Sequence, residues 1–66
     1  MIAIQFVKMG DFYEAFGTEA RIVAKTCGLV LTKRRSDGED ACGIPAWSSE
    51  ERFAELRAGG FLVSVK

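Results

Sequence analysis

The sequence predicts a single α+β domain over residues 1–66, in which a mixed sheet is flanked by two helices in the order β-β-α-β-β-α-β. Three observations predict this class: side chains alternate with a period of two at the start of the chain, two segments have helical spacing, and an Asp-Gly pair stands between apolar runs. A chain of this length buries only about 60% of the surface that its unfolded form exposes. We therefore expect one small core and a stability of roughly a few kcal/mol.

The first two elements are expected to be strands. Residues 2–8 (IAIQFVK) alternate between two faces, which is the period of a β-strand. Gly10 and Asp11 then favour a turn. Residues 12–16 (FYEAF) alternate again, which predicts a short extended segment that ends near Gly17.

The next segment changes to helical spacing. Thr18 is placed to cap a helix, Glu19 suits the positive end of its dipole, and Gly28 suits a left-handed stop. The apolar side chains between them recur at i, i+3, i+4 and i+7, at Ala20, Val23, Ala24 and Cys27. We therefore expect a helix from Thr18 up to Gly28.

A hairpin is expected in the middle of the chain. Residues 29–34 (LVLTKR) predict one strand, and residues 41–44 (ACGI) predict its partner, which Pro45 ends. Residues 35–39 (RSDGE) lie between them and contain the Asp-Gly pair that is typical of a tight hairpin turn.

The second helix and a final strand complete the order. Residues 48–51 (SSEE) have the pattern of a capping box, and the helix that they open is expected to run to about Ala58 and to stop at the two following glycines. The side chains expected to be buried around it are Trp47, Phe53, Ala54 and Leu56. Residues 61–65 (FLVSV) are nearly all apolar, which predicts a strand buried on both faces in the middle of the sheet.

The charge balance argues against long-range attraction to nucleic acid. Nine Lys and Arg residues stand against nine Asp and Glu residues, so the formal net charge is zero. No overall field attracts such a chain to nucleic acid, and any binding of that kind must come from local patches.

No apolar stretch approaches the ~18 residues of a membrane span, and no basic region precedes such a stretch. We therefore expect a cytoplasmic protein without membrane contact.

The two cysteines, Cys27 and Cys42, do not indicate a metal site. They do not form a CxxC pair, and no histidine is present to complete a zinc site. Reduced thiols in a cytosolic protein are favoured over a disulfide. No metal and no cofactor are expected.

The sequence also argues against an enzyme. It contains no GxxxxGK[ST] phosphate loop, no histidine that would act as a base, and no partner that would make one of its serines part of a triad. Two pairs of nearby carboxylates are present, Asp11 with Glu14 and Asp37 with Asp40. Solvated turn charges explain these pairs better than general acid–base catalysis does.

Phe12 and Glu14 form the sharper pattern. Residues i and i+2 of an extended segment point the same way, so an aromatic ring and a carboxylate share one face here. A phenyl ring enters and unstacks a base step from the minor groove in some DNA complexes, and a nearby carboxyl group is able to hydrogen-bond the displaced base. Without further context, however, a core aromatic beside a surface acid explains the same residues.

A group of basic residues is the second candidate site. Lys33, Arg34 and Arg35 end the predicted third strand, and Lys8 ends the first. Such residues hold phosphates without reading sequence. The alternative is a solubilising hairpin tip that is balanced by nearby acids at Asp37, Glu39 and Asp40.

Three separated blocks together resemble a known family. FVKMGDFYEAFGTEA, GLVLTKR and CGIPAWSSEERFAELRAGGFLVSV occur in this order over residues 4–65. They are similar to the blocks RMGDFYELF…DA, LxLTxR and AGIPxHxxxxYLxxLVxxGxxVAI of the N-terminal mismatch-recognition domain in the MutS family of DNA mismatch-repair proteins. The initial Met1 favours a short natural reading frame over a domain excised from a longer chain, although the sequence does not decide between them.

The resemblance implies roles for residues near the first turn. Phe12 matches the family's wedge phenylalanine, which stacks on a mispaired base, and Glu14 matches the carboxylate that hydrogen-bonds that base. Tyr13 is then expected to face the body of the domain and, with Phe16, to support the wedge. The segment 43–45 (GIP) is expected to be structural.

The function implied is a DNA-binding module for mismatched or distorted duplex DNA, weak on its own because the resemblance covers neither clamp nor ATPase domains. No nucleotide is expected, and a homodimer or a repair-protein partner is an open possibility. The alternative is a protein-interaction or oligomerisation module that keeps this fold without recognising mismatches. Its basis is the neutral charge together with an apolar patch expected at Phe12, Tyr13 and Trp47.

Overall fold

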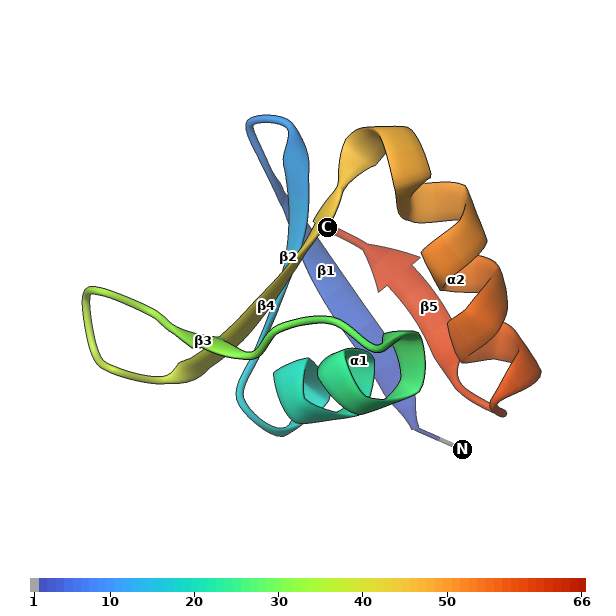
Figure 1. Ribbon diagram of the computed structural model, residues 1–66, viewed down its shortest axis with the longest axis horizontal. Coiled ribbons are helices and arrows are strands. Elements are labelled where there is room, and N and C mark those ends of the chain that lie inside the picture. The colour runs from blue at the N-terminus through green and yellow to red at the C-terminus, as the bar shows by residue number, and fades with distance from the viewer. Residues whose placement is uncertain (1) are drawn as a thin grey trace.

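The structure is a computed structural model that describes residues 2–66 (Figure 1). The alternating side chains at the start of the chain form a β-hairpin. Its strands are β1 (Ala3–Met9) and β2 (Phe12–Phe16). Ile4 and Phe6 of β1 are fully buried, as the period-two pattern predicts. The predicted turn is confirmed, since Gly10 has a φ of 60° and only two residues separate the paired Met9 and Phe12. Glycine with positive φ at the first central position is the pattern of a type II′ turn.

The remaining elements follow the predicted order. They are α1 (Thr18–Cys27), β3 (Thr32–Lys33), β4 (Asp40–Pro45), the 3₁₀ turn η1 (Ala46–Ser48), α2 (Ser49–Ala58) and β5 (Leu62–Val65). The strands form one five-stranded sheet in the order β3-β4-β2-β1-β5. β1 and β5 are parallel and the other neighbours are antiparallel, so the predicted α+β class with a mixed sheet is confirmed.

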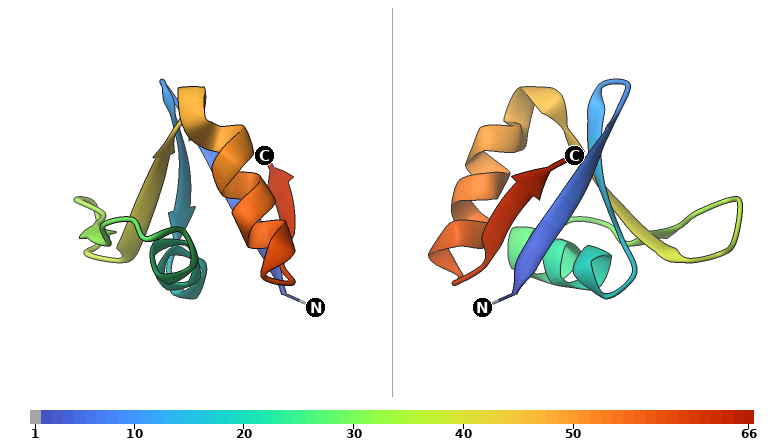
Figure 2. Two further views of the ribbon diagram at one scale, coloured as in Figure 1. Left: turned by 45° about the vertical axis from the view of Figure 1, so that its right-hand side comes forward. Right: turned by 180° about the vertical axis from the view of Figure 1, so that it is seen from behind.

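Both helices pack on the same face of this sheet (Figures 1 and 2). The core between the layers consists of Ile4, Phe6, Ala15, Ala20, Val23, Cys42, Ile44, Phe53 and Leu56. The Phe6 and Phe53 rings lie 5.0 Å apart between centroids, which joins β1 to α2. The fold therefore has two layers, and the opposite face of the sheet, here called the outer face, carries no helix among residues 2–66.

α1 ends as predicted but begins differently. Gly28 has the left-handed φ of 67°, and the Leu29 amide donates to the Ala24 carbonyl at 2.9 Å. The prediction that Thr18 caps the helix is wrong, because Gly17 holds that position and no side chain caps the first turn. The Glu19 carboxylate instead accepts a hydrogen bond from the Gln5 backbone N–H at 2.7 Å, which ties the helix to β1.

The middle hairpin is smaller than predicted. Only Thr32 and Lys33 of the predicted strand 29–34 pair with β4. Leu29 packs against the core while the two residues after it are exposed, because the chain must first travel from the end of α1 to the sheet edge. The connection is wider than a two-residue Asp-Gly turn, since residues 34–39 lie between the paired Lys33 and Asp40.

The start of α2 corrects two predictions. No capping box forms, because η1 leads directly into the helix and the hydroxyl groups point backwards: Ser48 donates to the Pro45 carbonyl and Ser49 to the Ala46 carbonyl. Phe53 and Leu56 are buried as predicted, whereas Ala54 is exposed and Trp47 is 89% exposed. The helix ends at Gly59 as predicted.

The prediction for the last strand is wrong in position. β5 is an edge strand that pairs only with β1, not a central strand. Its residues Leu62 and Val65 are 53% and 49% exposed. A run of apolar residues does not distinguish a strand covered on both faces from one that leaves apolar side chains at an edge, and only the pairing order decides this.

Leu56→Ala is expected to destabilise the fold by about 2–5 kcal/mol, because it leaves a cavity in a fully buried part of the core. That loss is comparable with the whole stability of so small a domain. Trp47→Ala is the control, and its effect is expected within about 0.5 kcal/mol because the indole is exposed. Urea unfolding followed by circular dichroism measures both, and equal losses would contradict the observed placement of Trp47.

Candidate nucleic-acid interface

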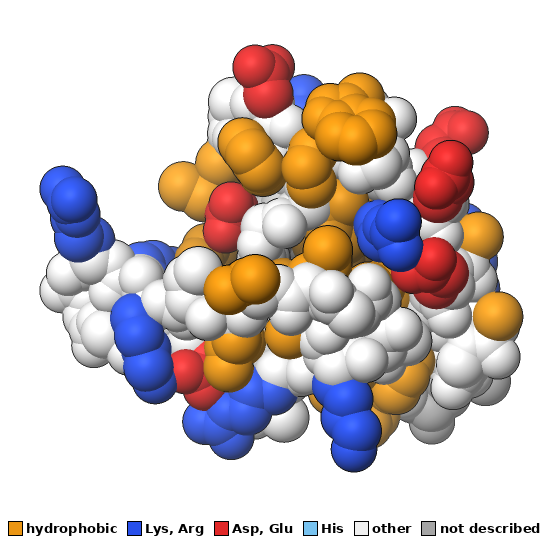
Figure 3. Space-filling model, in the orientation of Figure 1, with side chains coloured by type: hydrophobic (Ala, Val, Ile, Leu, Met, Phe, Trp, Pro, Cys, Tyr) orange, Lys and Arg blue, Asp and Glu red, His pale blue; other side chains and the backbone are white. Residues whose placement is uncertain are grey.

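The β1–β2 hairpin presents a short, braced tip. The Gly10-Asp11 turn places Met9 directly opposite Phe12. The Ala46 backbone N–H donates to the Asp11 carbonyl at 2.8 Å, so the tip is tied to η1. Hydrophobic side chains gather at this end of the molecule, over the hairpin tip and the start of α2 (Figure 3). The exposed ones there include Met9 at 52%, Phe12 at 44% and Trp47 at 89%.

Phe12 and Glu14 lie on the outer face of β2. The fully buried Ala15 points toward the helices, so the residues on either side of Tyr13 point away from them. Phe12 pairs with Met9 and Pro45, and Glu14 pairs with residues of the same two strands. The arrangement therefore has the geometry expected from the sequence, in which an exposed ring and a carboxylate share one face.

Tyr13 holds the strand between them against the core. Its ring meets that of Phe53 edge-on, with centroids 5.4 Å apart and an interplanar angle of 69°. The Lys8 ammonium lies 5.4 Å from the Tyr13 centroid, within the range of a cation–π contact. Tyr13 thus faces the body of the domain, as the resemblance implies.

Phe16 does not lie on the core side of β2 beneath Phe12. It lies on the outer face with Phe12, and the Arg34 guanidinium lies 4.3 Å from its ring centroid. The Phe16 and Tyr13 rings therefore lie on opposite faces of β2, which does not fit the expectation that they act together as one support.

Gly43 leaves room for the Glu14 side chain. The two residues are cross-strand partners, and a Cβ added to Gly43 would lie 2.4 Å from Glu14 Oε2. The carboxylate therefore lies across β4 where only glycine permits it. The sequence analysis names Gly43 only as part of a structural segment and misses that it leaves room for Glu14. The one sequence feature that points to this role is a glycine inside a predicted strand.

An open pocket of about 420 Å³ adjoins these two side chains. β2 and β4 form one side of it, and the segment between α1 and β3 forms the other. Its lining residues are Phe12, Glu14, Leu29, Val30, Thr32, Gly43 and Pro45. The Thr32 hydroxyl already donates to the Ala41 carbonyl at 3.1 Å. The Glu14 carboxylate is thus the only charged group in a largely apolar lining, which suits a flat aromatic group that carries N–H donors.

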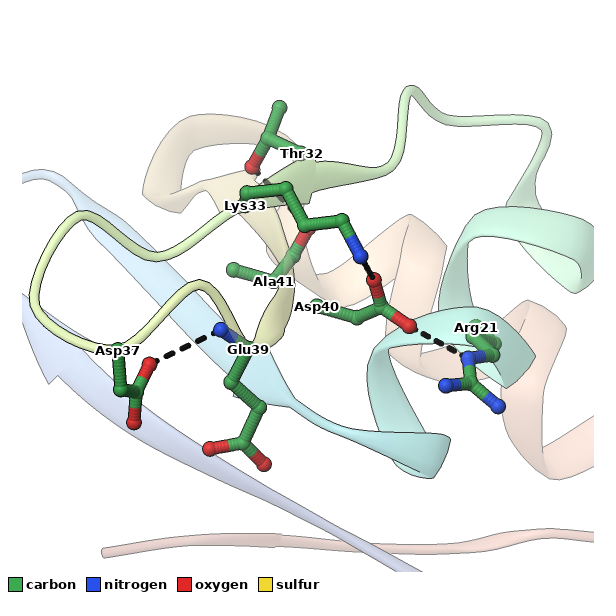
Figure 4. Close-up of polar contacts among 7 residues, drawn as sticks. All are labelled: Arg21, Thr32, Lys33, Asp37, Glu39, Asp40 and Ala41. Carbon is green, nitrogen blue, oxygen red and sulfur yellow. Dashed lines mark hydrogen bonds and ion pairs between the residues drawn. The ribbon is translucent and has the colours of Figure 1, made fainter.

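Two of the four predicted basic residues, Lys33 and Arg34, are paired with acids of the β3–β4 hairpin. Lys33 and Arg21 approach the two oxygens of Asp40 from opposite sides, each at 2.5 Å (Figure 4). Asp40 is buried, and the hydrogen bonds from Lys33 and then Arg21 lower the pKa of its carboxyl. Lys33 therefore acts in this structure as the partner of a buried acid.

Arg34 is engaged in the same way. It donates to Asp37 at 2.7 Å and to Glu39 at 3.0 Å. The hydrogen bond from Arg34, followed by one from the Glu39 backbone N–H, lowers the pKa of Asp37 to about 2. Arg35 is exposed in the same loop, with no ion pair among residues 2–66. Lys8 lies apart from these residues at the end of β1.

Burial raises the pKa of both cysteine thiols. Burial, followed by the nearby Glu55 carboxylate, raises the pKa of Cys27 to about 11, and burial also raises the pKa of Cys42. Both are free thiols. Residues 2–66 contain no cluster of three or more His, Cys, Asp or Glu side chains suited to a metal. Over the same range, no helix has the length and apolar character needed to cross a membrane.

Comparisons with known proteins agree on one family. A family model described as MutS domain I matches residues 1–65. DNA mismatch repair protein MutS of Thermodesulfovibrio yellowstonii is 41% identical over 66 residues, which cover 96% of this chain and 8% of that protein. The proteins of the same name from Azorhizobium caulinodans and Bradyrhizobium sp. are 46% and 44% identical, over 96% and 91% of this chain. The chain spans 7% of the length of each of these two relatives.

Gly43→Ala is expected to displace the Glu14 carboxylate while the fold remains, because the new methyl group overlaps Oε2 and Gly43 does not have a positive φ. The displacement is measured from the side-chain carboxyl chemical shift of Glu14 by NMR. Gly59→Ala is the control, since its Cβ would meet nothing closer than 3.4 Å. An unchanged Glu14 signal in Gly43→Ala would contradict the assigned contact.

Asp40→Asn is expected to lower the melting temperature at pH 7, and this effect is expected to shrink as the pH falls below about 4. The pKa of Asp40 is lowered from 3.8 in the folded protein, so its stabilising contribution is present above about pH 4 and disappears as the pH falls through the lowered value. Thermal unfolding across this pH range measures the effect. Asp11→Asn, at an exposed turn position, is the control. A loss in Asp40→Asn that does not shrink at all as the pH falls below about 4 would contradict the ion-pair explanation.

Proposed function

Because this chain belongs to the MutS domain I family, we propose that it binds duplex DNA at mispaired or distorted bases. In this proposal Phe12 enters the distorted step and Glu14 hydrogen-bonds the displaced base. The observation that carries it is the placement of the exposed Phe12 ring and the half-buried Glu14 carboxylate on one face of a braced hairpin. The protein acts by binding, without catalysis, nucleotide or cofactor.

The hairpin supports the role of Phe12 as a wedge. The ring is 44% exposed, but the strand that carries it is fastened on both sides and through Tyr13 to the core. A rigid support matters because insertion of an apolar side chain must offset the unstacking of a base step, which costs a few kcal/mol. A ring on a mobile loop would lose conformational entropy on binding, and this loss would weaken the complex.

Glu14 supplies the polar part of the site. Its carboxylate lies across Gly43 beside the pocket that Phe12 also lines. A mispaired base has hydrogen-bonding groups that no partner base satisfies, and a carboxylate accepts from an N–H group at such a base. In a paired duplex these groups are engaged and the negative charge of Glu14 is repelled by phosphates. This difference favours distorted sites.

Binding is expected to be weak for this chain alone. Stacking on one aromatic ring contributes about 1–3 kcal/mol, while bending the duplex costs on the order of 1–6 kcal/mol. The net charge is zero, and Lys33 and Arg34 are paired with acids, so few cations remain for phosphates. We expect dissociation constants of tens of micromolar or weaker, within the range of roughly 10⁻⁴–10⁻⁶ M for non-specific complexes.

A protein-interaction module remains the second candidate function. Trp47 at 89% exposure and Met9 at 52% lie near the same end as Phe12 and form an apolar surface of the kind that anchors protein partners. In either case we propose a cytoplasmic location, which suits the two free thiols.

The test is a titration of a duplex with one mismatch and of its fully paired counterpart at low salt. The mismatched duplex is expected to bind several-fold more tightly, and Phe12→Ala is expected to abolish that preference. Glu14→Ala is expected to reduce it. Trp47→Ala is the matched control, because it removes another exposed aromatic side chain outside the proposed site.

Three outcomes would count against the proposal. Equal binding of both duplexes by the wild-type chain would remove mismatch recognition. A preference that persists in Phe12→Ala and disappears in Trp47→Ala would place the contact elsewhere. Negligible DNA binding together with salt-insensitive capture of a repair protein would favour the interaction module.

A further inference from the structure

The pocket beside β2 contains a carboxylate without a cation. Glu14 lines this open pocket of about 420 Å³ and is half-buried. Among residues 2–66 no ion pair to Glu14 forms, whereas Asp37, Glu39 and Asp40 of the β3–β4 hairpin are all paired. A partly buried charge without a partner loses hydration and gains little in return. A ligand that supplies N–H donors would offset this cost.

The walls of the pocket are apolar on two sides. Phe12 and Pro45, which are paired across β2 and β4, form one side, and Leu29 and Val30 form the other. Val30 is 79% exposed although its side chain is apolar. A flat aromatic ring between these walls would have apolar contacts on both of its faces, which is how many proteins hold a base outside the duplex.

The size of the pocket suits one base. Ligand pockets of about 300–1,000 Å³ hold molecules up to the size of a drug, and this one lies near the lower end of that range. Because the pocket is open to solvent, a sugar and a phosphate attached to the base would remain outside it. The negative charge of the phosphate would then stay away from the Glu14 carboxylate.

The polar groups of the pocket favour one type of base edge. An ionised carboxylate only accepts hydrogen bonds, through its two oxygens. The Thr32 hydroxyl donates to the Ala41 carbonyl at 3.1 Å, so it too offers a ligand only an acceptor. The pocket side chains therefore select a ligand with N–H donors side by side, and two parallel donors on one carboxylate form a strong bidentate contact.

Guanine has this edge among the four bases of DNA. Its N1–H and its 2-amino group are adjacent donors on the Watson–Crick edge. Adenine and cytosine place a ring-nitrogen acceptor beside their amino group, and the N3–H of thymine lies between two carbonyl oxygens. An acceptor directed at a carboxylate is repelled by it, so these three bases match Glu14 less well.

We infer that this pocket binds a single guanine base, whose N1–H and 2-amino group donate to the two oxygens of Glu14 while its ring lies between Phe12 and Val30. For the source of the base the inference rests on the proposed function: an unpaired guanine leaves the duplex, and Phe12 fills the gap in the stack. A free guanine nucleotide carries the same base and is the other source, which the experiments separate.

The first experiment uses nucleotides without DNA. Guanosine 5′-monophosphate is titrated into the isotope-labelled chain at neutral pH and is expected to shift the backbone amide signals of Glu14, Val30 and Gly43. Its affinity is expected to be about tenfold higher than that of adenosine 5′-monophosphate. Inosine 5′-monophosphate lacks only the 2-amino group of the guanine nucleotide and is expected to bind severalfold more weakly. All three carry the same phosphate, so the differences report on the base.

Two variants test the contacts. Glu14→Gln keeps the size of the side chain but removes its charge and replaces one acceptor with a donor, so the preference for guanine over adenine is expected to disappear. Glu50→Gln makes the same change at an exposed position of α2 outside the pocket and is expected to leave the preference unchanged. Val30→Ala removes part of one wall and is expected to weaken guanine binding severalfold.

The second experiment uses duplexes with one unpaired nucleotide, which is guanosine, inosine or adenosine. The duplex with unpaired guanosine is expected to bind most tightly and the inosine duplex severalfold more weakly. Val30→Ala is expected to reduce this difference. A guanine preference in duplexes alone identifies DNA as the source of the base, and one in nucleotides alone identifies a free nucleotide.

The inference fails separately from the proposed function. Equal affinity for guanine and inosine in both experiments, or no binding in either, would overturn the inference even if mismatched duplexes still bind more tightly than paired ones. A guanine preference that survives Glu14→Gln, or that Glu50→Gln abolishes, would overturn it as well. Equal binding of mismatched and paired duplexes would reject the proposed function, whereas a guanine preference among free nucleotides would still support the pocket.

Discussion

The packing of β2 against α2 is the constraint on which the rest of the structure depends. Tyr13 meets Phe53 edge-on, and Phe53 in turn packs against Phe6 of β1. Because alternate residues of a strand point to opposite faces, these contacts on one side decide what the other side presents. A shift of β2 by one residue would bury Phe12 and Glu14 and expose Tyr13 and Ala15. The core thus determines the composition of the outer face.

The fixed position of β2 also explains why glycine stands at two places around the candidate site. A two-residue turn with positive φ at its first position requires Gly10, and this turn sets the register that brings Met9 opposite Phe12. On the neighbouring strand, the absence of a side chain at Gly43 lets the Glu14 carboxylate lie flat across the sheet. Gly10 thus acts through its backbone conformation and positions Phe12, whereas Gly43 leaves the space that the Glu14 side chain fills.

Charge in this protein is used mainly within the molecule. Asp40 is buried between Lys33 and Arg21, and Arg34 holds Asp37 and Glu39, so the wide β3–β4 loop is stabilised by its own ion pairs. Cations that are already paired contribute less to phosphate binding. The outer face and the hairpin tip therefore differ from a strongly basic DNA-binding surface, and the proposed recognition of DNA would depend on shape and on a few specific contacts.

The sequence by itself determined the α+β class, the order of elements, the Gly10 turn, the left-handed end of α1 at Gly28 and the shared face of Phe12 and Glu14, because each follows from local periodicity or backbone preference. Tertiary structure decided what depends on contacts distant in sequence. It placed the apolar β5 at an edge, left Trp47 exposed, replaced the capping box with backward hydrogen bonds from η1, and gave Lys33 and Arg34 acidic partners. The physical reason is that period and propensity describe each segment separately, whereas the neighbour of a strand, the cover over an indole ring and the partner of a cation are set only when the two layers pack together.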